Sequence, residues 1–409
     1  MTTKHRVTAP SSVAAIRWLT YLMFFMFAMT TDAVGVIIPK VIAEFRLSQT
    51  TAGALHYGSM AGIMGAGLFL GFLADRFGRK RTILAGLAVF ALTAFCVPVA
   101  SSFPMLLAMI CLAGASIGVF KTGALALVGD LSASTTELTS TMNLVEGFFG
   151  VGAIIGPLIV TLLATAGVSW RWLYVVAGGL CSLLFLIALS ARYPSAPVAT
   201  LEEKRSVGTA LRLVADPYAL GFSIAAFLYV AVECAIYVWM PTLLSGLKDS
   251  LLLRAGYALP AFFIMRAVGR FVGAWLLQTF DWTLALLFCA TAILLCFLGS
   301  VCWGLEAAFY LLPLSGLFMS IIYPTINSKG IGCFEPTDQG SVAGVILFFT
   351  CLGAILGPMS MSLLSDGVGD PAAGFRLATG YCGIFFIAAL YNHLRKPAES
   401  RLLEKSSAV

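Results

Sequence analysis

Charged residues are scarce in this chain. Only 11% of its 409 residues are Asp, Glu, Lys or Arg, and it contains three histidines. Soluble domains carry about 25% charged residues, so the composition excludes a chain whose whole surface faces water. In place of charge, 60% of the residues are hydrophobic, and the mean hydropathy is +0.96. The composition therefore indicates a protein that crosses a membrane many times.

Several chemical signatures are also missing. The chain has no Walker A sequence and no Cys-x-x-Cys pair, and none of its polar stretches is long enough to fold as a soluble domain. We therefore expect no enzymatic activity, no metal site and no bound cofactor. The net charge of +6 comes from basic residues in short loops. Membrane topology accounts for that placement, so no nucleic-acid partner is expected.

What the sequence does contain is a series of apolar runs, each near or above the roughly 20 residues that cross a bilayer as a helix. One set lies near 17–39, 50–74, 82–101, 104–129, 140–165 and 170–192, and a second near 217–245, 254–278, 282–303, 305–327, 339–364 and 371–394. We predict an all-α membrane protein with twelve transmembrane helices. Its parts would be a tail (1–16), a six-helix bundle (17–192), a linker (193–216), a second six-helix bundle (217–394) and a second tail (395–409).

The two halves share local features. Asp32 precedes Pro39 in the first run, and Glu233 precedes Pro241 in the seventh. Gly-Pro pairs recur at 156–157 and 357–358. A repeated half of this kind predicts two bundles related by a pseudo-two-fold axis, with a solute site near the middle of the membrane.

Lys and Arg residues are distributed unequally between the two sides. The even number of runs places both tails on one side, and that side also receives the basic loop at 76–81 and the basic linker. The positive-inside rule then predicts cytoplasmic termini. Short loops and basic tails suit a multi-pass protein of a bacterial inner membrane.

The loop between the second and third runs carries a dense motif, Gly-Phe-Leu-Ala-Asp-Arg-Phe-Gly-Arg-Lys-Arg-Thr, at 71–82. It resembles the signature loop of the major facilitator superfamily, and the resemblance extends over essentially the whole chain. The basic side chains alone would hold this loop in the cytoplasm. The resemblance further implies a conformational latch in which Asp75 pairs across the two halves. The latch residues would be Gly71, Asp75, Arg76, Gly78 and Arg79.

Three segments resemble the fucose/glucose-galactose branch of that superfamily, whose members are sugar:proton symporters. They are the fifth run with Asn143 and residues 150–157, the seventh run at 229–241, and the tenth at 316–326. Lys121 departs from this pattern, because members of that branch tend to carry an acidic residue there.

Charges within apolar runs are the strongest physical pointer to function. Each is costly unless paired or wetted, so each is expected to face the interior of a bundle. Similar depth predicts a Lys121–Glu146 pair, either structural or functional, and a Glu233–Arg266 pair. Asp32 lies deeper without an obvious partner, and it is either a proton-coupling carboxylate or a group bathed by water at the outer mouth. Predicted proton-coupling residues are Asp32 and Glu146, and predicted solute-binding residues are Lys121, Asn143, Glu233, Tyr237, Trp239, Arg266 and Asn327.

Together these features predict a secondary active transporter that moves a small polar, sugar-like solute by alternating access. The transmembrane proton gradient would drive it, and a monomer in the lipid bilayer would suffice. Efflux of drugs or metabolites and transport of organic anions are alternatives, since Lys121 and Arg266 would suit a carboxylate. A non-transporting membrane sensor is a further alternative, which the lack of extramembrane domains disfavours.

Overall fold

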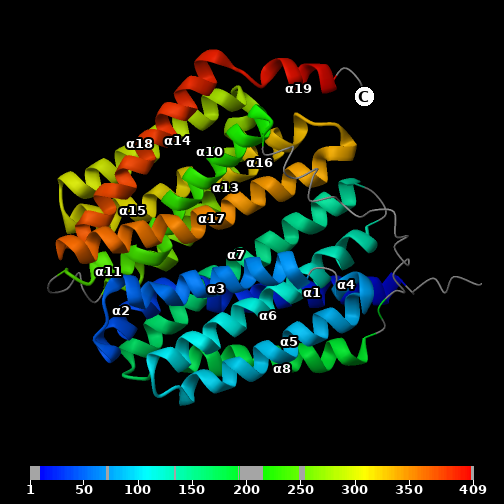
Figure 1. Cartoon of the computed structure of the whole chain (residues 1–409), viewed down its shortest axis with the longest axis vertical. Helices are drawn as coiled ribbons and strands as arrows, with labels where there is room; N and C mark the ends of the chain where they lie inside the picture. Colours follow the sequence, from blue (N-terminus) through cyan, green and yellow to red (C-terminus); the bar gives the residue numbers. More distant parts are fainter. Residues whose placement is uncertain are drawn as a thin grey trace, which may run out of the picture. The chain divides into compact units, whose positions relative to one another are not determined.

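Helices make up nearly all of the described chain (Figure 1), which in this computed structural model comprises residues 10–70, 73–132, 135–191, 193, 215–247 and 254–406. No strand occurs within those ranges. Eleven helical segments among the described residues are long and apolar enough to cross a membrane. Together with α3 (Gln49–Leu70), which is more polar, they correspond to the twelve predicted runs. The predicted all-α membrane fold is confirmed.

The chain divides into two compact units. The first comprises Met1–Ala33 with Gly58–Glu202, and the second comprises Val34–Tyr57 with Glu203–Val409. The boundary after Glu202 falls inside the predicted linker, most of which lies outside the described residues. Residues 34–57, from the predicted first bundle, belong to the second unit.

The first unit packs around aromatic side chains. Its elements are α1 (Pro10–Thr31), the later part of α3, α4 (Leu73–Arg76), α5 (Arg79–Cys96), η1 (Val97–Val99), α6 (Phe103–Asp130), α7 (Thr135–Thr165) and α8 (Trp172–Ser190). Phe27 on α1 contacts Phe90 on α5 and Phe120 on α6, with ring centroids 4.8 and 4.6 Å apart. All three rings are fully buried.

The first helix begins earlier than predicted. Residues 10–16 belong to α1 rather than to a polar tail. Proline is tolerated at the first helical position, and the side chain of Ile16 is buried against the bundle.

The second unit holds the other helices. They are α2 (Val34–Phe45), the first turns of α3, α10 (Pro217–Cys234), η2 (Ala235–Trp239), α11 (Met240–Leu244), α13 (Ala258–Thr279), α14 (Trp282–Cys302), α15 (Leu305–Met319), α16 (Ile322–Gly332), α17 (Pro336–Val368), α18 (Pro371–Arg395) and α19 (Glu399–Ser406).

Glycine pairs spaced one turn apart bring helices together in both units. A Cβ on Gly152 or Gly156 of α7 would lie 2.1 or 2.0 Å from a backbone oxygen of α1. A Cβ on Gly353 of α17 would lie 2.5 Å from the Phe227 oxygen of α10, and one on Gly357 would lie 2.6 Å from Ala231. Contact this close requires glycine. The repeat noted in the sequence therefore corresponds to the same packing device in each unit.

The tail predicted to follow residue 394 contains a helix. Arg401 of α19 donates to the Asp216 carboxylate at 3.2 Å and lies over the rings of Tyr218 and Phe334, 4.2 and 5.3 Å from their centroids. Asp216 also caps α10 by accepting from the backbone N–H groups of Tyr218 and Ala219. The last helix is thus fastened to the beginning of α10.

Candidate functional site

The helix that carries Glu233 is interrupted by one π turn. Helix α10 passes through η2 into α11, where Pro241 has no N–H to donate to the carbonyl of Tyr237. Gly35 of α2 lies against that carbonyl, since a Cβ on this glycine would come within 1.8 Å of the oxygen. π turns inside α-helices are frequent at functional sites. Here the turn separates Glu233 from a segment that packs on α2.

Glu233 and Arg266 form an ion pair between α10 and α13, as predicted. The Glu233 side chain is 8% exposed and that of Arg266 is 26% exposed. Taking a carboxylate out of water costs several kcal/mol, and the guanidinium supplies the compensating charge. The partial exposure of Arg266 leaves part of the cation accessible beside the buried acid.

Tyr229 connects this pair to a break between two further helices. It lies one turn before Glu233, is fully buried, and donates its hydroxyl to the Met319 carbonyl at 2.8 Å. Met319 ends α15, and α16 begins at Ile322, two residues before Pro324. Asn327, a predicted solute-binding residue, is half-buried on α16. Tyr229 thus links the helix that carries Glu233 to the break between α15 and α16.

The predicted aromatic residues, Tyr237 and Trp239, belong to the π turn itself. Trp239 is 3% exposed, and its indole N–H donates to the Pro358 carbonyl at 2.8 Å. Tyr237 is half-buried, with its hydroxyl 2.8 Å from the Cys234 sulfur and its ring 6.5 Å from that of Phe263. The hydrogen-bonding group of Trp239 is therefore engaged by the protein backbone, whereas part of Tyr237 remains accessible.

His56 and Tyr57 of α3 lie beside the π turn and were not predicted as site residues. His56 is 1% exposed, lies 3.0 Å from the Ala354 oxygen through Nε2, and places its ring 5.6 Å from that of Tyr237. Tyr57 donates to the Pro358 carbonyl at 3.1 Å. Both residues could have been noticed in the sequence as two adjacent polar side chains within the apolar run at 50–74. They were missed because site residues were chosen mainly by their charge.

In the first unit, the predicted Lys121–Glu146 pair is wrong. The Lys121 ammonium lies 5.2 Å from the ring centroid of Phe149, and among the described residues no ion pair joins it to Glu146. Glu146 and Asn143 are exposed on α7. Similar depth on neighbouring helices had suggested a pair, but Lys121 meets the residue one turn beyond Glu146.

Asp32 occupies the turn between α1 and α2. It is half-buried, and Thr31 donates its hydroxyl to Oδ2 at 2.8 Å. A carboxylate at a helix interruption in a membrane-spanning segment is positioned to exchange protons if water reaches it. Both interpretations made from the sequence, proton coupling and a wetted outer mouth, stay predictions.

The loop motif is described only in part. Gly71 and the side chain of Asp75 lie outside the described residues, so the latch stays a prediction. Arg76 lies over Phe77, and Gly78 adopts φ +87°, a left-handed conformation that favours glycine. Arg79 forms an ion pair with Asp130 at the end of α6, in which Nε of the arginine lies 3.0 Å from Oδ2 of the aspartate.

Lys80, next in the motif, has a different local partner. Its ammonium donates to the carbonyls of Leu189 and Ala191 at 2.8 and 2.7 Å. Those carbonyls lie at the end of α8, where helix carbonyls lack partners and a cation is favourable. Within the first unit, the basic residues of the motif therefore fasten the ends of α6 and α8.

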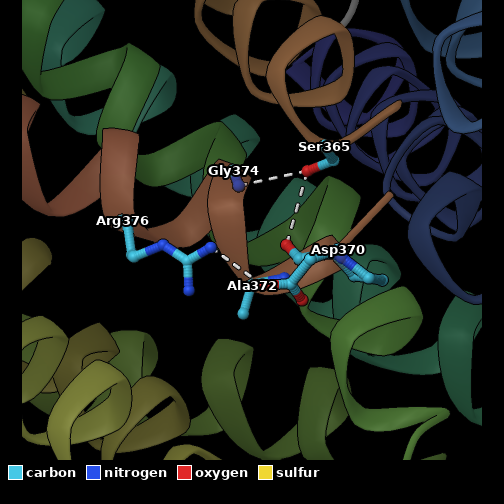
Figure 2. A network of polar contacts seen from close by, with 6 residues as sticks. Ser365, Asp370, Ala372, Gly374 and Arg376 are labelled. Carbon is cyan, nitrogen blue, oxygen red and sulfur yellow. Dashed lines mark hydrogen bonds and ion pairs between the residues drawn. The ribbon is translucent and has the colours of Figure 1, made fainter. Parts of the chain in front are cut away.

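Figure 2 shows the turn that joins α17 to α18. Asp370 accepts from the Ala372 N–H at 2.9 Å and from Arg376 at 2.8 Å, and these bonds lower the pKa of its carboxyl. Ser365 accepts from the Gly374 N–H at 3.1 Å. The turn is thus held by its own side chains.

The cysteines and the metal-ligating side chains can be described only within the ranges given above. All ten cysteines lie within the described residues and are free. In the described ranges, no three His, Cys, Asp or Glu side chains gather as metal ligands.

Comparisons with known proteins identify the family. The model of the Major Facilitator Superfamily matches residues 20–358. A glucose/galactose transporter of Brucella abortus is 27% identical, over 85% of this chain and 87% of that protein. An L-fucose-proton symporter of Escherichia coli is 24% identical, over 90% of each chain. The crystal structure of a nucleoside transporter, NupG, superposes with a TM-score of 0.72 at 17% identity, over 93% of this chain and 98% of that one. Both the predicted family and the predicted branch are supported, and the chain belongs to the major facilitator superfamily.

Proposed function

We propose that this protein is a proton-coupled secondary transporter of a small polyhydroxylated solute of the hexose class. The observation that carries the proposal is the Glu233–Arg266 pair, a mostly buried carboxylate and a partly exposed guanidinium beside a π turn. Hydroxyl groups of a sugar suit such a pair, because the carboxylate accepts hydrogen bonds and the guanidinium donates them. The glucose/galactose and fucose relatives support the same solute class.

Accessible polar groups complete the proposed solute site. Tyr237 and Asn327 are half-buried near the irregular parts of α10 and α16. Lys121 and Asn143, in the first unit, stay proposed solute-binding residues. Trp239 would act indirectly, by holding the π turn, because its N–H is bonded to the backbone.

For coupling, Asp32 is the proposed proton carrier, and Glu146 is a second candidate. Asp32 sits at a helix interruption, where water entering from one side would meet its carboxylate. The transmembrane proton gradient would supply the free energy, without a cofactor.

In the proposed topology both termini are cytoplasmic, the membrane is a bacterial inner membrane, and the protein works as a monomer. The loop at 71–82 would act as the cytoplasmic latch.

A second candidate is transport of an organic anion. The observation that favours it is Lys121, a cation on α6 that rests on Phe149 and has no ion pair among the described residues. An aromatic carboxylate would satisfy both the ammonium and the ring face.

Uptake into proteoliposomes separates these functions. The purified protein would be reconstituted and given an inward proton gradient with radiolabelled glucose, galactose, fucose or an aromatic carboxylate. Hexose accumulation that disappears with a protonophore supports the proposal. Accumulation of the carboxylate alone, lost in Lys121→Met, supports the second candidate. If no member of the panel accumulates, the hexose-class proposal is wrong.

A further inference from the structure

The N-terminus of α3 is capped by a carboxylate from a distant helix. Asp366 of α17 accepts from the Gln49 N–H at 2.9 Å through Oδ1 and from the Thr50 N–H at 2.8 Å through Oδ2. All of these residues belong to the second unit. The carboxylate thus uses both of its oxygens on the first turn of another helix.

These bonds fill a need that α3 does not meet by itself. The first N–H groups of a helix have no intrahelical acceptor, and a negative charge there is favourable. Helix α3 has no acidic residue in its own first turn, and the Ser48 hydroxyl serves one backbone donor of that turn, the Thr51 N–H, at 3.2 Å. Asp366 satisfies the two remaining donors, so the order of this turn depends on α17.

A second contact extends the attachment along the same stripe of α17. Tyr57, two turns into α3, donates to the Pro358 carbonyl and lies 2.9 Å from the Ser362 hydroxyl oxygen. Positions 358, 362 and 366 are each one turn apart and share one helix face. Residues 49–57 therefore lie along α17, with the Asp366 carboxylate at one end.

The same region contains a polar group that this arrangement leaves unsatisfied. Gln49, Thr242 and Ser365 line the same small recess, which has no room for a water molecule. Thr242 is 8% exposed, and its hydroxyl has no hydrogen-bond partner in the described part of the chain. A buried unsatisfied hydroxyl is costly, and separation of α3 from α17 would admit water to it. Asp366 is itself exposed, so water can replace the amides it binds.

We propose that Asp366 is a releasable latch, which holds the α3 N-terminus on α17 in this state and lets it go in another state of the transport cycle. The second half of this proposal rests on the proposed function. In the proposed topology the latch is on the extracellular side, opposite the loop at 71–82. Asp366 acts through the position of α3 and is therefore a positioning residue.

Hydrogen exchange tests the cap directly. In detergent or nanodiscs, Asp366→Ala is expected to raise the exchange rate of amides in residues 49–57 roughly tenfold, the effect of losing a helix cap. The matched control is Asp370→Ala, which removes a carboxylate four residues after Asp366, between α17 and α18. Asp370 caps α18 through Ala372 (Figure 2), so its loss should affect exchange at the start of α18 alone.

A more conservative variant covers the case in which Asp366→Ala does not fold. Asp366→Asn keeps the shape and one acceptor oxygen but removes the charge, so an intermediate increase in exchange is expected. Unchanged exchange at 49–57 in the folded Asp366 variants would overturn the proposal. Equal increases there for the Asp366 and Asp370 alanine variants would also overturn it, because the effect would then be a general loosening of the turn.

Release during the cycle requires a separate test. The paired variant Tyr57→Cys/Ser362→Cys replaces two side chains that are in contact. Bridging the two thiols with a short, reducible bifunctional thiol reagent, which spans the length of the lost tyrosine ring, should stop the uptake of hexose that the same double variant shows before treatment, and reduction should restore that rate. Full uptake by the cross-linked protein would overturn the latch. If the wild type transports no hexose, the proposed function fails instead, and hydrogen exchange still tests the cap.

Discussion

Arg266 on α13 supplies the counter-charge for Glu233, an acid on the last turn of α10 before the π turn. The two side chains differ in exposure, 26% for the arginine and 8% for the acid. A solute that approached the pair would therefore meet the guanidinium first. The carboxylate would accept hydrogen bonds from the solute only if the ion pair loosened. In the proposed function, the pair would therefore contribute both to stability and to solute binding.

Removing either member of the pair is expected to destabilise the protein. Glu233→Gln or Arg266→Gln leaves one charge in a site that holds two, at a cost of about 3 kcal/mol. The double variant, which leaves no unpaired charge, should recover most of the lost stability. Thermal unfolding of the purified variants measures these differences. Additive losses in the double variant would show that the two side chains are not coupled.

The exposed pair Arg376–Asp370 serves as the control for that series. Its side chains are 51% and 42% exposed, and exposed pairs contribute about 0–1 kcal/mol. Arg376→Gln should therefore leave the unfolding midpoint almost unchanged.

Gly35→Ala is expected to be strongly destabilising. The added Cβ would lie 1.8 Å from the Tyr237 carbonyl oxygen, so α2 would have to move away from η2. A loss of about 2 kcal/mol or more is expected for such overpacking, seen as lower yield and a lower unfolding temperature. Gly221→Ala on α10 is the control, because a Cβ added there would meet no neighbouring atom within 4 Å. A stable Gly35→Ala protein would contradict the close packing.

Asp32→Asn tests proton coupling. The amide of asparagine cannot bind and release a proton as the Asp32 carboxylate is proposed to do. Gradient-driven accumulation should therefore be lost, whereas exchange of labelled for unlabelled solute across the membrane should remain. Both are measured in the same proteoliposomes. Asp370→Asn, which lies outside the membrane-spanning segments, should retain both activities. Full accumulation by Asp32→Asn would remove this residue from the coupling mechanism.

Acid should weaken the turn between α17 and α18 through Asp370. The Ala372 N–H and Arg376 hold the carboxyl pKa of Asp370 below its ordinary value of 3.8. A lowered pKa in the folded protein stabilises it fully above pH 3.8, and this contribution is lost as the pH falls further. Unfolding of the wild type should therefore depend on pH more steeply below 3.8 than unfolding of Asp370→Asn. Parallel curves would contradict this role.

The sequence was sufficient to predict the membrane helices and the family, because apolar length and the 71–82 motif are local signals. It was also sufficient for Glu233–Arg266, where two opposite charges of similar depth lie on neighbouring helices. The same reasoning failed for Lys121 and Glu146. Depth along a helix follows from residue counting, but rotation about the axis depends on packing, which turns Lys121 toward Phe149.

Contacts between groups that lie far apart in the chain could not be predicted from the sequence. Pro241 indicates a missing hydrogen bond, but nothing local predicts that Gly35 covers the carbonyl it leaves exposed. Asp366 lies just beyond the predicted run at 339–364, and no role was predicted for it. Its role depends on the first turn of α3, 316 and 317 positions earlier in the chain, where an acidic residue is absent.

The Asp216–Arg401 contact has a consequence for biosynthesis. The two residues are separated by 185 positions, and every helix from α10 to α18 lies between them in the chain. Asp216 therefore enters the membrane region with its backbone cap but without its guanidinium partner. The N-terminal end of α10 receives that partner only after α18 has been translated, so this contact forms after all the helices from α10 to α18 have been made.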